Sequence, residues 1–199
     1  MQKIIIYGFG MSRHNRLIKP DDVVWSLNDY WNNPQELQFK KHPVKPSIVF
    51  QIHDDFADDK NRFTEWKKHY EIDNCNVIVS KLCGLKNEEL FDFERFDREL
   101  RIEGFKLVGG ISFMLAHAYM QGVKEIELMG IDFTDRREYT RQMPETLNAI
   151  KILRKKGIKI IAPQEHNWND RSRKIDWSTV QEISMDYNRD LSNHIWVNA

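Results

Sequence analysis

The sequence of 199 residues is poor in the residue types that mark several large classes of protein. It has only two cysteines, Cys75 and Cys83, with no cluster of histidine or cysteine near either. This excludes a disulfide-rich scaffold and favours reduced thiols in a cytoplasmic protein. No stretch approaches the ~20 consecutive apolar residues of a membrane span. The first eight residues lack the architecture of a signal peptide and are typical of a first strand.

An excess of charge of either sign is also missing. Lys plus Arg and Asp plus Glu number 30 each, so the formal net charge is zero and a uniformly basic coat for nucleic acid is excluded. A locally basic stretch remains in the last third of the chain. Its residues are Lys151, Arg154, Lys155, Lys156, Lys159, Arg171, Arg173 and Lys174. Such a stretch is either the solvated face of a helix or a contact surface for a polyanion such as DNA.

Several short catalytic motifs do not occur. There is no H-E-x-x-H, paired C-x-x-C, G-x-x-x-x-G-K-[ST] or G-x-S-x-G sequence, so zincin, zinc-finger, P-loop and serine-hydrolase interpretations have no support. We therefore predict no metal site. The hydrophobic fraction of 41% and the aromatic fraction of 12% are instead typical of one folded domain with a substantial core.

Short β-branched runs alternate with helical patterns along the chain. Strands are predicted at 3–7, 23–27, 47–52, 76–79, 124–129 and 157–163, and helices at 56–70, 112–121 and 143–156. Strands that alternate with helices imply crossover connections and a mainly parallel sheet with helices on both faces. We expect a single α/β domain over residues 1–163.

Two segments stand apart from this alternation. Residues 81–104 are acidic and contain Phe91, Phe93 and Phe96, so they form either a helical lid over a cleft or an inserted helix packed on the core. Residues 164–199 are rich in aromatic side chains and have little periodicity. We expect this extension to pack on the domain or on a second subunit, which leaves a homo-oligomer open.

Polar residues follow the predicted strands at the points where they end. They are Ser12, Asn28, His53 and Asp132. Ligands of parallel sheets bind beyond the carboxyl ends of the strands, so these side chains are candidates for one shared site. The alternative is that they are polar only because loops generally are.

Two glycine-containing turns precede predicted helices and could bring backbone N–H groups close to an anion. The candidate nucleotide-binding residues, together with Asn28, are Gly8, Gly10, Ser12, Gly109, Gly110 and Ser112. Both turns could equally be plain tight turns, the second with Ser112 as a helix cap. After Asp132 comes a polar run that suits a sugar or diphosphate or is an exposed loop; it contains Arg137, Tyr139, Arg141 and Gln142.

The segment from Gly109 to Phe133 resembles the core block of the family 42 sialyltransferases. It is equally similar to proteins related to the archaeal pterin diphosphokinase. The shared pattern is a turn of small residues, an apolar helix and G-x-K-E-I-x-L-x-G-x-D-F, which here spans 122–133. The first turn resembles the G-x-G-P-S motif of these families, and Asn28 fits a nucleotide-contacting asparagine after the second strand. The resemblance implies a Rossmann-like fold.

Small phage proteins of the same superfamily are more similar still. They share W-S-L-N at the end of the second strand (25–28 here), F-x-x-H-D at the end of the third (50–54), and a G-I-D motif followed by a segment like 138–145. The sialyltransferases carry their general-base histidine after the G-I-D-F block. This sequence has Thr140, Arg141 and Gln142 there, so His53 is the substitute that we expect.

The leading hypothesis is a cytoplasmic transferase of phage type, a nucleotide-sugar-dependent glycosyltransferase with no required cofactor. The donor would be UDP-, CDP- or CMP-linked, and the acceptor could be a modified DNA base. His53 would be the base, and Asp132 would bind the ribose or contribute to catalysis. One alternative is Mg²⁺-dependent diphosphate transfer through Asp54, Asp55 and Asp132. Another is a nucleotide-binding or sequestering protein without turnover.

Overall fold

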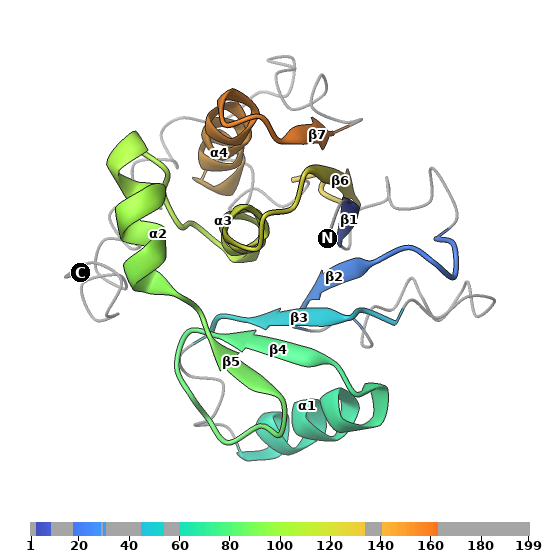
Figure 1. Ribbon diagram of the computed structural model, residues 1–199. Helices are drawn as coiled ribbons and strands as arrows, with labels where there is room; N and C mark the ends of the chain where they lie inside the picture. Colours follow the sequence, from blue (N-terminus) through green and yellow to red (C-terminus); the bar gives the residue numbers. More distant parts are fainter. Residues whose placement is uncertain are drawn as a thin grey trace, which may run out of the picture.

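The computed structural model describes residues 3–8, 18–28, 30, 45–53, 60–133 and 141–162, and these form a parallel sheet with helices on both faces (Figure 1). The strands are β1 (Lys3–Tyr7), β2 (Val24–Leu27), β3 (Ile48–Gln51), β4 (Asn76–Val79), β5 (Glu88–Leu90), β6 (Glu125–Met129) and β7 (Lys159–Ile161). The helices are α1 (Lys60–Asp73), α2 (Phe93–Glu99), α3 (Gly110–Met120) and α4 (Met143–Lys155), with a 3₁₀ turn at Arg101–Glu103.

The seven strands lie in the order β5-β4-β3-β2-β1-β6-β7, and every neighbouring pair is parallel. The chain therefore starts in the middle of the sheet, builds outward to β5, and then returns to the other side of β1 for β6 and β7. This Rossmann-like arrangement confirms the predicted α/β class. The carboxyl ends of β1, β2, β3 and β6 consequently lie along one edge of the sheet.

Two layers of helix cover the described sheet. Helices α2, α3 and α4 lie on one face, where the largest apolar cluster includes Ile4, Trp25, Phe50 and Ile126 of the strands (Figure 1). Helix α1 lies on the other face and packs Trp66 and Tyr70 against β3 and β4. Helix α3 is buried on nearly all sides, as its almost uniformly apolar sequence predicts.

The segment 81–104 contains a strand that the sequence did not predict. Glu88 accepts backbone hydrogen bonds from Cys83 (2.9 Å) and Gly84 (2.9 Å), which fixes the short connection before β5. Glu88, Glu89 and Leu90 have little intrinsic strand propensity, so pairing with β4 imposes the conformation. The following helix α2 buries Phe96 in the core.

Cys75 and Cys83 do not form a disulfide. Burial and the neighbouring Glu88 carboxylate raise the pKa of the Cys83 thiol to about 12, so this group stays protonated at neutral pH.

Among the described helices, none has the length and apolar character needed to cross a membrane. The predicted extension 164–199 lies outside the described residues.

Candidate functional site

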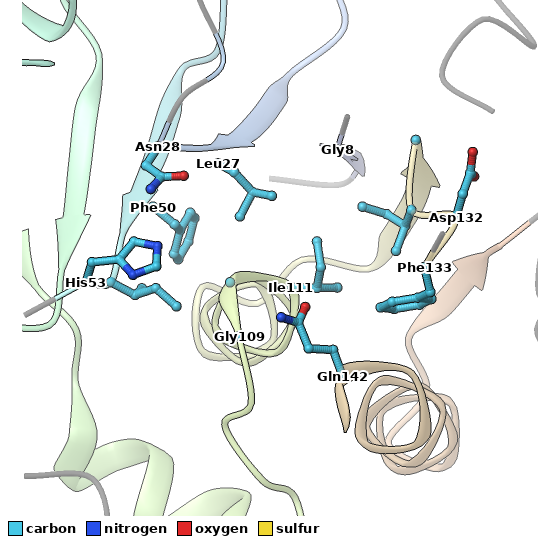
Figure 2. Close-up of a pocket in the computed structure, with 14 residues that line it drawn as sticks. Gly8, Leu27, Asn28, Phe50, His53, Gly109, Ile111, Asp132, Phe133 and Gln142 are labelled. Carbon is cyan, nitrogen blue, oxygen red and sulfur yellow. The ribbon is translucent and has the colours of Figure 1, made fainter. Parts of the chain in front are cut away.

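A cavity of about 380 Å³ opens at the carboxyl edge of the sheet (Figure 2). It is lined by Gly8, Leu27, Asn28, Phe50, Ile52, His53, Gly109, Gly110, Ile111, Gly130, Ile131, Asp132, Phe133 and Gln142. These residues lie in or just after the carboxyl ends of β1, β2, β3 and β6, or at the beginnings of α3 and α4. The volume is within the ~300–1,000 Å³ range of small-molecule sites.

The cavity lies where the chain reverses its direction across the sheet. From β1 the connections run toward β5 on one side, whereas β6 and β7 add to the other side. Open α/β sheets bind ligands at such switch points. Gly8 follows β1, and a Cβ atom there would stand 2.5 Å from the carbonyl oxygen of Gly130, which follows β6. Glycine at position 8 is therefore required by the close approach of the two strand ends.

Asn28 and His53 occupy neighbouring strand ends on one side of the cavity (Figure 2). Tyr70 of α1 donates its hydroxyl proton to the carbonyl oxygen of Asn28 at 3.2 Å, which anchors this strand end from the opposite face of the sheet. Ser80 donates to the carbonyl oxygen of Ile52 at 3.3 Å and supports the end of β3 beside His53. His53 itself is exposed, so its imidazole is open to a ligand.

Asp132 lies on the other side of the cavity, in the connection after β6 (Figure 2). The backbone of this connection is left-handed at Gly130, with φ 69°, and at Phe133, with φ 48°. A left-handed backbone is costly for a bulky residue such as Phe133, and strain of this kind is concentrated at functional sites. Between them, Asp132 is half-buried and Phe133 is packed into the core.

His53 and Asp132 share the cavity but are not adjacent. Strands β3 and β6 are separated by β2 and β1, so their ends are three inter-strand spacings apart, roughly 14 Å. The two side chains therefore lie on different sides of the cavity.

The turn before α3 forms the floor of the cavity. Gly109 has φ 76°, and a Cβ atom there would stand 2.6 Å from Cδ of Gln142. A Cβ atom at Gly110 would collide with the side chain of Leu27. The start of α3 is therefore in close contact with the side chains of Leu27 and Gln142, and the positive φ favours glycine at position 109.

The structure brings together most of the described residues that the sequence indicated. Gly8, Asn28, His53, Gly109, Gly110, Asp132 and Gln142 all line the cavity. Two described candidates do not: half-buried Arg141, and Ser112, which is completely buried. The Ser112 hydroxyl accepts the N–H of Val108 at 2.6 Å and donates to the carbonyl oxygen of Gly109 at 2.8 Å, so it is engaged with the backbone of the turn before α3. Four further candidates, Gly10, Ser12, Arg137 and Tyr139, lie outside the described residues.

The apolar wall of the cavity was not predicted from the sequence. It consists of Leu27, Phe50, Ile52, Ile111, Ile131 and Phe133. Most of these residues are next to the polar residues at the strand ends. That position could have indicated them, because the last residues of parallel strands line a site at the sheet edge. Behind Phe50 lies the ring of His117, with centroids 5.5 Å apart. Burial lowers the pKa of His117 to about 4, against a smaller opposing effect of Asp92.

Charge is sparse among the described lining residues. Asp132 and His53 are the titratable side chains there, and neither lysine nor arginine is among them. The described part of the chain also holds no group of three or more acidic, histidine or cysteine side chains placed to bind a metal ion. Asp54 and Asp55, which the diphosphate-transfer alternative requires, lie outside it.

The basic residues of α4 are at the far end of that helix. Gln142 precedes α4 at the cavity, whereas Arg154 and Lys155 are in its last turn. A helix of 13 residues is about 20 Å long. Lys156 and Lys159 also form ion pairs with the carboxylates of Glu103 (2.7 Å) and Glu125 (3.0 Å), respectively. The basic side chains in the last turn of α4, together with Lys156 and Lys159, are therefore near the opposite edge of the sheet from the cavity.

The fold and this cavity define a Rossmann-like α/β protein with a candidate ligand site at the switch point of a parallel sheet. The sequence matches no protein-family model and no curated protein. Among solved structures it is similar to the sialyltransferase CstII from Campylobacter jejuni. For the complex with cytidine-5′-monophosphate the TM-score is 0.52 and the identity 21%, over 80% of this chain and 78% of that one. For the complex with CMP-3FNeuAc the TM-score is 0.52 and the identity 22%, over 80% and 79%. The similarity establishes a shared fold.

Proposed function

We propose that this protein is a glycosyltransferase that uses a nucleotide-sugar donor. The observation that carries the proposal is the cavity at the switch point, with Asn28, His53 and Asp132 around a floor of glycine backbone. The fold shared with a sialyltransferase studied in complexes with CMP and CMP-3FNeuAc supports a nucleotide-linked donor. We also propose that this protein is related to the small phage proteins that its sequence resembles.

In this proposal the nucleotide lies along the glycine floor. Asp132 accepts hydrogen bonds from ribose hydroxyls, and the Asn28 and Gln142 amides contact polar edges of the donor. Gly10 and Ser12 of the first turn extend the nucleotide contacts. Arg137, Tyr139 and Arg141 meet the diphosphate or the sugar. The described lining offers no cation for phosphate, so the proposal assigns that charge to these arginines outside the described lining.

His53 is the general base in the proposed reaction. The acceptor hydroxyl gives its proton to the imidazole as its oxygen bonds to the anomeric carbon of the sugar. The bond from that carbon to the phosphate oxygen breaks, and the electron pair leaves with the nucleotide. Histidine is a common general base, and exposure lets His53 reach an acceptor that arrives from solvent.

The acceptor in this proposal is a hydroxyl compound, and a hydroxymethylated DNA base in a phage-infected bacterial cytoplasm is the specific candidate. The described basic side chains of α4 lie away from the cavity, so they provide no support for a DNA path to His53. A test with DNA and with a simple sugar acceptor separates these possibilities once a donor is known.

The donor is identified by thermal unfolding in the presence of CMP and of UDP-, CDP-, CMP-, GDP- and ADP-linked sugars. A ligand present at about 100 times its dissociation constant stabilises the fold by about 2.7 kcal/mol. We expect one nucleotide series to raise the melting temperature. Asn28→Ala at the cavity should reduce this shift, whereas Asn76→Ala, at the amino end of β4, should leave it unchanged.

No stabilisation by any member of the series would contradict the proposal. Stabilisation without sugar transfer or donor hydrolysis would support the non-catalytic nucleotide-binding protein instead.

A further inference from the structure

Ser112 is a buried residue whose side chain organises the turn before α3. It is the third residue of that helix and has no solvent-exposed surface. Its hydroxyl accepts a hydrogen bond from the N–H of Val108 at 2.6 Å and donates one to the carbonyl oxygen of Gly109 at 2.8 Å. One side chain thus fixes two successive backbone groups that precede the helix.

The turn that Ser112 fixes contacts two walls of the cavity. Gly109 meets the side chain of Gln142 at the start of α4, and Gly110 meets the side chain of Leu27 at the end of β2. Neither contact leaves space for one additional carbon atom. A small displacement of the turn therefore moves the floor and both walls, because packed interiors transmit strain.

We infer that Ser112 is a positioning residue for this cavity: its two hydrogen bonds hold Gly109 and Gly110 where Leu27 and Gln142 are packed against them. The choice of ligand for testing this inference rests on the proposed function, whereas the observed hydrogen bonds and contacts do not depend on it. Ser112 lies behind the floor and touches no ligand itself, so it acts through the backbone of the turn.

A purely structural role would have a different effect. Helix α3 is held in the core by its own apolar side chains, among them Met114, Leu115 and Ala118, all fully buried. Loss of the hydroxyl should therefore loosen the turn more than the helix. A cap that contributes only stability would lower the melting temperature and leave the affinity for a ligand unchanged in the folded protein.

The test compares Ser112→Ala with Thr146→Val. Thr146 of α4 is also fully buried, but its hydroxyl has no hydrogen-bond partner among the described residues, so Thr146→Val removes a buried hydroxyl without breaking a bond seen there. Affinity for CMP is measured by calorimetry well below the melting temperature of each variant. If CMP gives no binding, the nucleotide with the largest thermal shift replaces it. We expect Ser112→Ala to weaken binding about tenfold and Thr146→Val to change it less than twofold.

The rate of hydrogen exchange at the Val108 amide is a second readout. This rate should be higher in Ser112→Ala and unchanged in Thr146→Val. Unchanged affinity in folded Ser112→Ala overturns the inference, whatever its melting temperature. Absence of nucleotide binding in the wild type overturns the proposed function. The two failures are distinguishable, because failure of the proposed function is seen with the wild type alone and failure of the inference only by comparing the wild type with Ser112→Ala. If Ser112→Ala does not fold, Ser112→Cys makes the same comparison with a thiol of similar size and weaker hydrogen bonds, and it should again weaken binding.

Discussion

At the scale of single residues, the roles proposed for His53 and Asp132 are separable because the two side chains occupy different sides of the cavity. His53→Ala removes a base that acts only in the transition state. We expect kcat to fall 10²–10⁴-fold while the nucleotide dissociation constant stays nearly the same. Nucleotide release from the identified donor measures the first quantity and calorimetry the second. Undiminished turnover would move the base elsewhere, with Tyr139 or Asp54 as the next candidates.

Asp132→Asn should have the opposite signature. A carboxylate that accepts ribose hydroxyl hydrogen bonds acts in the ground state as well, so the variant should bind nucleotide about 10–100-fold more weakly. Calorimetric titration checks this, with Asp21→Asn as the control because Asp21 is exposed and outside the cavity. Equal losses of binding in the His53 and Asp132 variants would favour a nucleotide-sequestering protein over an enzyme.

His117 makes the stability of the fold depend on pH. The folded protein binds a proton on this side chain only near pH 4, whereas an unfolded chain binds it near pH 6.5. The unfolded state therefore holds more protons between these values, and the free energy of unfolding decreases as the pH falls from about 6.5 toward 4. The difference between the two pKa values corresponds to roughly 3 kcal/mol.

His117→Leu should remove this part of the pH dependence, because the apolar side chain has nothing to protonate. Urea unfolding at several pH values between 4 and 7 measures it. His69→Gln on α1 is the control variant, and its free energy of unfolding should still decrease from pH 6.5 toward pH 4. A His117→Leu curve parallel to that of the wild type would contradict the assignment.

At the scale of elements, the ends of β1 and β6 are in contact at Gly8. A methyl group there would stand 2.5 Å from a backbone oxygen, which cannot rotate away as a side chain can. We expect Gly8→Ala to destabilise the protein by about 2 kcal/mol or more, through overpacking, and to distort the cavity. Gly122→Ala is the comparison: φ at Gly122 is 71°, but nothing lies within 4 Å of the added carbon.

The cost of Gly122→Ala should be about 1 kcal/mol, from backbone conformation alone, with nucleotide affinity unchanged. Urea unfolding and calorimetry of the two variants decide between these expectations. Similar unfolding curves and unchanged affinity in both variants would show that the sheet edge tolerates a wider separation of β1 and β6.

At the scale of the whole molecule, much of the architecture follows from patterns that are visible in the chain. The β-branched runs predict β1, β3 and β6, and the parallel topology brings Asn28, His53 and Asp132 to one edge without any knowledge of side-chain contacts. Strand β5 could not be predicted, because its Glu-Glu-Leu sequence becomes a strand only through pairing with β4. The two hydrogen bonds of Ser112 could not be predicted for a similar reason: they depend on the exact conformation of Val108 and Gly109.

The position of β1 in the middle of the sheet also sets an order of events during synthesis. Ile5 pairs with Val24 of β2 soon after both are made, but its other partner is Glu127 of β6. Contacts between segments so distant in the chain form late, because closing the intervening loop has a large entropic cost. The half-sheet from β1 to β5 can therefore assemble first, with one edge of its first strand open. The wall formed by Gly130 to Phe133 arrives afterward, so the complete cavity exists only once β6 has joined the sheet, and a nascent chain that stops before β6 lacks it.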